Sequence, residues 1–235
     1  MIERQIKTSK QQDFVYQSTH PDVTAWFGNP ENYTDIILNQ INQERMYDPI
    51  FADRDHMTVI DLGANCGLFS LYAADSCQTL IAVEPTPNTF RVLEEIVKDH
   101  TNIKPLQLAI GPHNEMTSFF INENSTTNSM LNRNGHETQV QCMTLETLLF
   151  KENLDHVDFI KCDIEGSEMQ ALTDATLGPI SDKVKFWFVE VHQTNVAESA
   201  WPGNLESNRQ QLAELFQRHG YQTESVIHDQ LFAWR

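Results

Sequence analysis

The segment spanning residues 58–85 constrains the fold more than any other part of the chain. An apolar run with Val59 and Ile60 ends in Asp61 and a turn with two glycines, and a second apolar run, residues 80–83, ends in Glu84. Apolar runs of this kind are typical of parallel strands buried on both faces. A strand, a helix and a strand in this order form a βαβ unit, whose ligands bind at the carboxyl ends of the strands. We therefore predict a nucleotide-binding α/β fold.

The turn after the first strand has the composition of a cofactor site. Gly63 and Gly67 carry no side chain, and Asn65 tolerates left-handed backbone better than most residues, so we expect this backbone to approach a ligand closely. Glu84 is placed to accept both hydroxyl groups of a ribose. A glycine turn alone is equally typical of any α/β protein, and it is Glu84-Pro85 that favours a cofactor site.

The spacing of the glycines indicates which cofactor fits. A nicotinamide or flavin site requires G-x-G-x-x-G and places a pyrophosphate on a helix N-terminus, whereas this turn has the pattern Asp-x-Gly-x-Asn-x-Gly. An acid at position 61 would repel a pyrophosphate but suits the ammonium and sulfonium groups of S-adenosylmethionine. We predict that cofactor, with a nicotinamide-dependent oxidoreductase and a non-catalytic cofactor-binding partner protein as alternatives.

Composition narrows the class of protein further. A chain of 235 residues suits one α/β domain with small additions, and its net charge of −17 argues against nucleic acid or anionic membrane as the main partner. Residues 1–12 lack the apolar core of a signal peptide, and no stretch approaches the roughly 20 apolar residues of a membrane span. The four cysteines form no C-x-x-C pair, so we expect free thiols in a reducing cytoplasm.

We divide the chain into an N-terminal extension, residues 1–56, and a cofactor-binding domain, residues 57–235. In the extension, residues 14–16 and 23–27 are predicted to pair as a hairpin. An amphipathic helix over residues 31–46 is predicted to stop at Asp48-Pro49. We expect the extension to act as a structural cap, and the alternative is a lid over the cofactor.

Strands and helices keep alternating after Glu84. The patterns predict helices over 88–99 and 204–219, a helix capped near Thr144, a mobile loop over 122–137, and strands over 103–110, 116–121, 138–143, 157–162 and 184–191. Residues 221–227 and 231–234 are predicted to close the domain as an antiparallel hairpin.

Two later strands also end in acids at the predicted ligand-binding edge. Strand 157–162 leads into Asp163 and Glu165, and strand 184–191 ends with Glu190 and His192, which face the same way because residues two apart on a strand do so. We predict that these four residues are catalytic. Glu168 falls in the first turn of the next helix, and we interpret it as a cap stabilised by the helix dipole.

These motifs together resemble the FkbM-type methyltransferases, over about residues 58–192. The resemblance is carried by Val59-Ile60-Asp61-Leu62-Gly63-Ala64-Asn65-x-Gly67, Val83-Glu84-Pro85-x-Pro87-x-x-Phe90-x-x-Leu93, Ala109-Ile110-Gly111, Thr144-Leu145, Ile160-Lys161-x-Asp163-x-Glu165-Gly166-x-Glu168 and Glu190-x-His192. It implies a class I, S-adenosylmethionine-dependent methyltransferase: a Rossmann-like three-layer α/β sandwich whose mostly parallel, seven-stranded sheet includes the C-terminal antiparallel hairpin. Such enzymes usually methylate a hydroxyl of a sugar or secondary metabolite.

By position, the resemblance assigns three groups of cofactor-binding residues. The methionine end would be held by Asp61, Gly63, Ala64, Asn65 and Gly67, the ribose by Glu84 with Pro85, and the adenine by Ala109 and Ile110. Residues 126–131 match the family's serine-rich stretch only loosely.

The reaction requires a positioned acceptor and a base. Holding a hydroxyl oxygen about 3–3.5 Å from the sulfonium methyl supplies most of the rate enhancement, and a placed base adds about 10²–10⁴-fold. His192 and Asp163 are the alternatives for the base. Asp163, Glu190 and His192, with Glu165, would also form an oxygen-rich site for Mg²⁺. We predict O-methylation of a small hydroxylated or glycosyl acceptor, and the sequence assigns neither that acceptor nor an oligomeric state.

Overall fold

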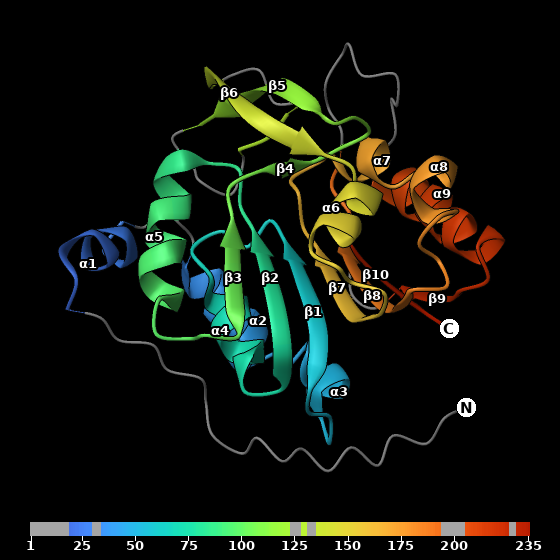
Figure 1. Cartoon of the computed structure of the whole chain (residues 1–235), viewed down its shortest axis with the longest axis horizontal. Helices are drawn as coiled ribbons and strands as arrows, with labels where there is room; N and C mark the ends of the chain where they lie inside the picture. Colours follow the sequence, from blue (N-terminus) through green and yellow to red (C-terminus); the bar gives the residue numbers. More distant parts are fainter. Residues whose placement is uncertain (1–18, 30–33, 123–127, 131–134, 194–204, 226–228) are drawn as a thin grey trace.

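The computed structural model describes residues 19–29, 34–122, 128–130, 135–193, 205–225 and 229–235, and a seven-stranded sheet lies at its centre (Figure 1). Its strands are β1 (Met57–Leu62), β2 (Cys77–Val83), β3 (Ile103–Leu106), β7 (Val157–Cys162), β8 (Val184–Glu190), β9 (Gln222–Ser225) and β10 (Gln230–Trp234). They are ordered β3-β2-β1-β7-β8-β10-β9, and β10 alone runs opposite to the direction of the other six strands. The predicted mostly parallel sheet with a C-terminal antiparallel hairpin is confirmed.

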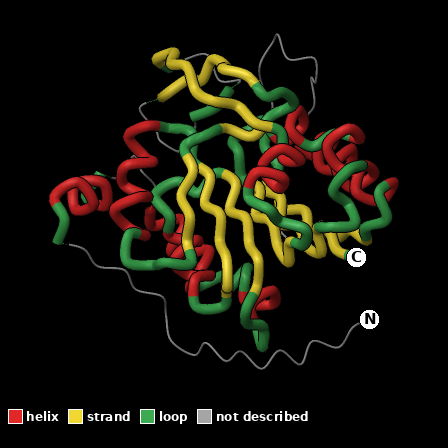
Figure 2. The backbone as a smooth tube through the Cα atoms, in the orientation of Figure 1, coloured by secondary structure: helices red, strands yellow, loops and turns green. Residues whose placement is uncertain are grey.

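Helices cover both faces of this sheet (Figure 2). One face carries α1 (Pro21–Phe27), α2 (Thr34–Asn42), α3 (Asp48–Phe51), α4 (Leu68–Ala74) and α5 (Pro87–Val97), and the other carries α6 (Leu145–Lys151), α7 (Glu168–Ala171), α8 (Asp174–Leu177) and α9 (Leu205–Arg218). Successive strand residues point to opposite faces, so Val59 packs with the first group of helices and Ile60 with the second. Both residues are fully buried, which confirms the predicted three-layer sandwich.

The chain changes direction across the sheet between β1 and β7. From β1 it steps outward through β2 to β3, and it later returns to β7 on the other side of β1. In parallel α/β sheets, ligands bind at the carboxyl ends of the strands at such a switch point. The register pairs Asp61 with Lys161 and Leu62 with Cys162, so the turns that follow β1 and β7 lie side by side.

A second, three-stranded sheet lies over the carboxyl ends of β1, β2 and β3 (Figure 1). It consists of β4 (Ala109–Ile110), β5 (Glu115–Ile121) and β6 (His136–Met143) in the order β4-β6-β5. The predicted single strand over residues 103–110 is therefore wrong, since it is divided between the two sheets. The start of β6 and the buried Asn128 and Ser129 likewise replace parts of the predicted loop, and the rest of that loop, residues 123–127 and 131–134, lies outside the described residues.

The N-terminal extension differs from its prediction in two places. Residues 23–27 belong to α1, so the predicted hairpin is wrong, and its other strand, residues 14–16, lies outside the described residues. Pro21 and Asp22 explain the helix, because proline and an acid both favour the first turn of a helix. Asp48-Pro49 begins α3 for the same reason, and the predicted stop at this pair is wrong because α2 already ends at Asn42.

The described part of the predicted extension packs on the rest of the chain through α1 against α5 and α2 against α4. All four cysteines are free thiols, as expected. Among the described helices, none combines the length and the apolar character that a membrane crossing requires.

Candidate active site

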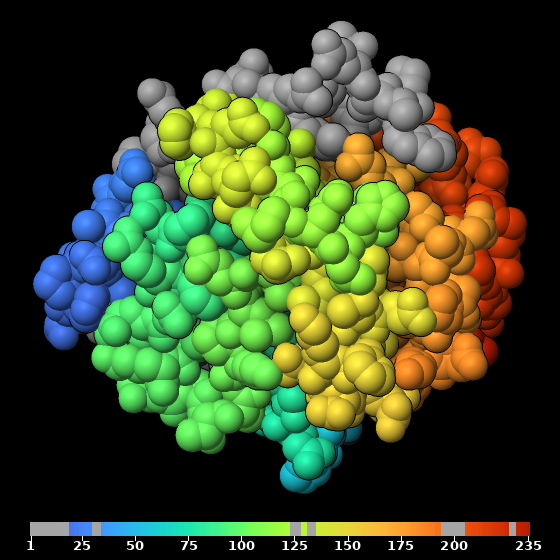
Figure 3. All heavy atoms as spheres, turned by 45° about the horizontal axis from the view of Figure 1, so that its top comes forward, coloured from blue at the N-terminus to red at the C-terminus, as the bar shows by residue number. Residues whose placement is uncertain are grey.

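A cavity of about 280 Å³ opens at the carboxyl ends of the strands, beneath the second sheet. In Figure 3, which turns this end toward the viewer, atoms of β5 and β6 form part of the surface. Most of the predicted site residues line the cavity: Gly63, Ala64, Asn65, Glu84, Pro85, Ala109, Ile110, Asp163, Glu165, Glu190 and His192. Asp61 and Gly67 are buried and are not among the described residues that line the cavity. The helix α2 also borders the cavity, through Ile36, Ile37 and Gln40.

The two glycines of the turn after β1 are required by packing within the protein. A Cβ on Gly63 would lie 1.8 Å from the backbone oxygen of Asp163, and a Cβ on Gly67 would lie 2.6 Å from Cδ1 of Leu93. Both glycines have positive φ, and Asn65 does as well. The missing side chains therefore make room for the turn after β7 and for α5, while the backbone of Gly63 still lines the cavity. The expected close approach of this backbone to a ligand stays a prediction.

Asp61 is completely buried behind the cavity. Its Oδ2 accepts a hydrogen bond of 2.6 Å from the hydroxyl of Ser70, and its Oδ1 lies 3.9 Å from Nζ of Lys161. Burial raises the pKa of this carboxyl, and Lys161 opposes that change. The side chain of Asp61 does not line the cavity. Its predicted effect on the methionine end of the cofactor would therefore be indirect, through the backbone of the turn after β1.

Glu84 reaches the cavity from the end of β2. One carboxylate oxygen accepts the N–H of Asn65 at 3.1 Å, and the other accepts the N–H of Thr86 at 2.8 Å. Burial raises the pKa of Glu84 to about 7, against the effect of these hydrogen bonds. Because each carboxylate oxygen accepts more than one hydrogen bond, both can also accept from a ribose diol.

Ala109 and Ile110 line the cavity from β4, together with Phe119 from β5. Two residues of the polar stretch that were not predicted as site residues, Asn128 and Met130, lie beside them. The Oδ1 of Asn128 accepts the N–H of Asn122 at 2.7 Å, which ties this segment to the end of β5. An apolar slot with one amide group suits an adenine ring.

Lys161 connects the turns after β1 and β7, and it too was not predicted. Its Nζ lies 2.9 Å from Oδ2 of Asp163, and its side chain is 7% exposed. Burial would lower the pKa of Lys161, but Asp163 and then Asp61 are among the groups that hold it well above its usual value. Burial conversely favours neutral Asp163, yet Lys161 and His192 lower the pKa of that carboxyl. Asp163 is therefore an ionised group paired with a buried ammonium.

His192 follows β8 and lies among three carboxylates. Its Nδ1 is 3.0 Å from Oε1 of Glu168, and its Nε2 is 3.4 Å from Oε2 of Glu165 and 3.9 Å from Oδ1 of Asp163. Burial would lower the pKa of His192, but Glu168, Glu165 and Asp163 raise it well above 6.5. These carboxylates therefore favour the protonated imidazolium form of His192.

The remaining two acids face the same cluster. Burial and the charge of Asp163 raise the pKa of Glu165, whose backbone adopts a left-handed φ of 55°. Asp163 is the main cause that raises the pKa of Glu190 to about 8. A non-glycine residue in the left-handed region is uncommon, and such strain concentrates at functional sites.

The interpretation of Glu168 as a helix cap is incomplete. Its Oε1 accepts the N–H groups of Ile164 and Gly166, which belong to the loop before α7, and it contacts His192. No nearby position in the sequence signals this contact, because His192 lies 24 residues further along the chain.

The strand order and the cavity at the switch point define the class I fold of S-adenosylmethionine-dependent methyltransferases. Residues 61–223 match the family model described as the methyltransferase FkbM domain, and the chain belongs to this family. The predicted resemblance is confirmed, and the oxidoreductase alternative is set aside.

Individual relatives are more distant. The chain is 27% identical over 174 residues to "Methyltransferase 1" of Beauveria bassiana (strain ARSEF 2860), which covers 62% of this chain and 70% of that protein. The crystal structure of the FkbM methyltransferase from Methylobacillus flagellatus KT matches with a TM-score of 0.50 at 17% identity. That match covers 77% of this chain but 44% of the other, so this chain spans less than half of that protein, and the likeness concerns the fold.

Proposed function

We propose that this chain transfers the methyl group of S-adenosylmethionine to a hydroxyl oxygen of a small, uncharged acceptor such as a sugar or secondary metabolite. The position of His192 carries this proposal. Glu84 at the end of β2 and His192 after β8 are separated by β1 and β7, which is about 14 Å at the usual strand spacing. With the ribose on Glu84, the methionine part extends along the turn after β1, and the acceptor lies on the His192 side.

In this reaction the acceptor oxygen forms a bond to the methyl carbon as the carbon–sulfur bond breaks, and S-adenosylhomocysteine leaves. The hydroxyl proton passes to Nε2 of His192, which must first be neutral. A bound sulfonium favours the neutral form because like charges disfavour the imidazolium. Asp163 is the weaker base of the two, since its lowered pKa and its ion pair with Lys161 both stabilise its ionised form.

The polar groups of the site support an uncharged acceptor. Glu84, Asp163, Glu165 and Glu190 line the cavity, and the raised pKa values of Glu84, Glu165 and Glu190 let these carboxyl groups donate as well as accept hydrogen bonds toward hydroxyl groups. The whole chain carries a net charge of −17. Carboxylates accept hydrogen bonds from hydroxyl groups but repel phosphates. Nucleic acids and anionic membranes are therefore not proposed as partners. The four free thiols suit a reducing compartment such as the cytoplasm.

A divalent cation is not part of this proposal. Ligand atoms of Asp163, Glu165 and His192 lie within 4.8 Å of one another, and in the described part of the chain this group does not include the predicted ligand Glu190. The ammonium of Lys161 already pairs with Asp163 at 2.9 Å. We expect turnover to survive exhaustive chelation, whereas a loss that Mg²⁺ restores would establish the cation.

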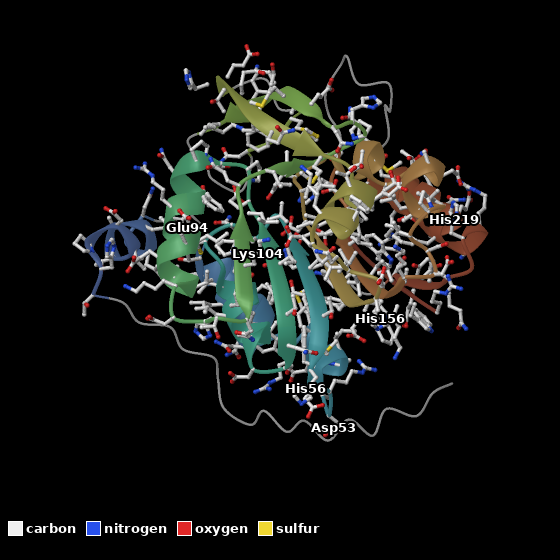
Figure 4. The ribbon with its side chains drawn as sticks, viewed as in Figure 1. Asp53, His56, Glu94, Lys104, His156 and His219 are labelled. Atoms are coloured by element: carbon white, nitrogen blue, oxygen red, sulfur yellow. The ribbon has the colours of Figure 1, made fainter. Side chains whose placement is uncertain are left out.

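The test is a screen with labelled S-adenosylmethionine that follows methyl transfer to neutral glycosides and polyols, amines, phosphorylated sugars and RNA. We expect transfer to neutral hydroxylated acceptors and a loss of about 10²–10⁴-fold in His192→Gln, with the affinity for S-adenosylhomocysteine retained. His219→Gln is the control, because His219 pairs with Asp174 beside α9, away from the cavity (Figure 4).

Three results of the screen would overturn the proposal. Methyl transfer confined to an amine or to RNA would show that the acceptor is not a neutral hydroxylated compound. Full activity of His192→Gln would show that His192 is not the base. Tight cofactor binding without transfer to any acceptor would favour the non-catalytic partner protein.

A further inference from the structure

Glu168 is a carboxylate that the reaction described above does not use directly. It is 1% exposed and begins α7, one turn away from the cavity residues Asp163 and Glu165. A buried carboxylate is costly unless it is hydrogen-bonded or paired. Here one oxygen, Oε1, is within hydrogen-bonding distance of the N–H groups of Ile164 and Gly166, at 3.1 and 3.2 Å, and of Nδ1 of His192 at 3.0 Å.

The direction of the hydrogen bond to His192 follows from the two backbone contacts. Because Oε1 already accepts from two N–H groups, it is an acceptor toward the imidazole as well, so Nδ1 carries the hydrogen. When the ring loses one proton, it therefore loses the proton of Nε2. That nitrogen faces Glu165 and Asp163 at the cavity.

We infer that Glu168 is a positioning residue that fixes the ring of His192 with Nδ1 protonated and Nε2 presented to the acceptor. A base whose orientation is set by a third group is a common arrangement in active sites. A second contact restrains the same residue, since Nδ2 of the buried Asn208 in α9 donates to the backbone oxygen of His192 at 2.9 Å. This inference rests on the proposed function of His192 as the base.

A purely structural role for Glu168 is the competing explanation, because its backbone hydrogen bonds hold the loop of residues 164–166. The two explanations differ in what they predict for the imidazole. A loop-holding residue alters stability but leaves the protonated nitrogen of His192 unchanged, whereas a positioning residue determines which nitrogen keeps its proton.

The test is a two-bond ¹H–¹⁵N correlation spectrum of the histidine rings, recorded from pH 7 to about pH 10 with S-adenosylhomocysteine bound. The chain has nine histidines, and the signals of His192 are identified because they are absent from the spectrum of His192→Gln. In the wild-type protein we expect Nε2 to lose its proton as the pH rises while Nδ1 stays protonated. A wild-type ring that instead keeps the proton on Nε2 would overturn the inference without any variant of Glu168.

Glu168→Gln adds a functional readout. An amide retains an oxygen for the loop but also offers N–H donors, so we expect Nδ1 of His192 to become deprotonated in part of the population. On the acceptor found in the screen, kcat should fall about 10- to 100-fold with the KM for S-adenosylmethionine unchanged. In the His192→Gln background the same change should cost nothing further, because Glu168 acts through His192.

Thr173→Ala is the matched control for stability. Thr173 caps α8 by accepting the N–H of Thr176 at 3.3 Å, so its loss weakens the neighbouring short helix without touching His192. If Glu168→Gln behaves like this control, with a lower Tm and unchanged His192 nitrogen signals, the role of Glu168 is structural and the inference fails. A wild-type protein that methylates no acceptor would count against the proposed function alone, since the ring spectrum needs no acceptor.

Discussion

The turns after β1 and β7 both contain residues of positive φ and present different groups to the cavity. These residues are Gly63, Asn65 and Gly67 in one turn and Glu165 and Gly166 in the other. An aspartate lies near each strand end, since Asp61 is the next-to-last residue of β1 and Asp163 follows the last residue of β7. The turn after β1 contributes mainly its backbone and small side chains, because Asp61 is buried behind it. The turn after β7 contributes carboxylates.

The turns at these two adjacent strand ends therefore have different roles. In the proposed function, the first turn forms a wall along which the methionine part would lie, and the second turn contributes the carboxyl groups beside which the methyl group would be transferred. Lys161 joins them, at 2.9 Å from Asp163 and 3.9 Å from Asp61. Changes in the two turns should therefore have different consequences for binding and for chemistry, and a change at Lys161 should affect both.

The largest effect is expected for Lys161→Met. Removing one partner of a buried ion pair leaves an uncompensated charge, which costs about 3–5 kcal/mol of unfolding free energy. Urea unfolding measures this loss. Lys104→Met is the control, because Lys104 (labelled in Figure 4) is 56% exposed and its pair with Glu152 should contribute less than about 1 kcal/mol. Equal losses in the two variants would show that Lys161 does not join the turns in the way described.

Gly63→Ala should come next, because it forces the two turns apart. Its Cβ would collide with the backbone of Asp163, and overpacking of this kind costs about 1–3 kcal/mol in addition to the strain of positive φ. We expect S-adenosylhomocysteine binding to weaken in calorimetry as well. Gly220→Ala has a similar φ of 86° and no atom within 4 Å of the new Cβ, so it isolates the backbone strain. If the two variants were equally stable and Gly63→Ala bound the cofactor normally, the close approach of the turns would be unimportant.

Glu84→Gln should separate binding from stability. Loss of charged hydrogen bonds to the ribose should weaken S-adenosylhomocysteine binding by about 1.5–3 kcal/mol, roughly 10- to 100-fold, in calorimetry. The stability effect has the opposite sign. Burial raises the pKa of Glu84 from 4.5 to about 7, so the wild-type protein loses stability as the pH rises through this range.

The variant lacks this ionisable carboxyl and should therefore be the more stable protein at pH 8, by up to about 3 kcal/mol, but not at pH 4. Thermal unfolding at the two pH values measures the difference. A variant that binds the product as tightly as the wild type would remove Glu84 from the ribose site.

The smallest effect concerns the pH dependence of methyl transfer. The base must be neutral, and the surrounding carboxylates raise the pKa of His192 above 6.5, so the rate should still be rising with pH above that value. A pH–rate profile at saturating cofactor measures this rising limb of the rate, and the profile of His192→Gln should lack the limb. A limb centred at or below 6.5 would show that another group is the base or that the cofactor cancels the effect of the carboxylates.

Local sequence patterns predicted the sheet and most of the cavity, because strand ends and glycine turns are coded by neighbouring residues. Lys161 was detectable but missed: a lysine in a buried strand requires a carboxylate partner, and Asp163 is two residues away. The error at residues 23–27 arose because a short apolar run is compatible with either a strand or a helix. Pro21 and Asp22, which lie in the first turn of α1, favour the helix. The contacts of Glu168 with His192 and of Asn128 with the cavity depend on how distant segments fold together.

The most direct test of the division between the two turns is a crystal structure of the protein with S-adenosylhomocysteine bound. We predict that the ribose hydroxyls lie within about 2.5–3.2 Å of the Glu84 carboxylate and that the sulfur faces the open space beside Asp163, Glu165 and His192. A ribose bound away from Glu84, or a sulfur turned away from those three side chains, would contradict the account.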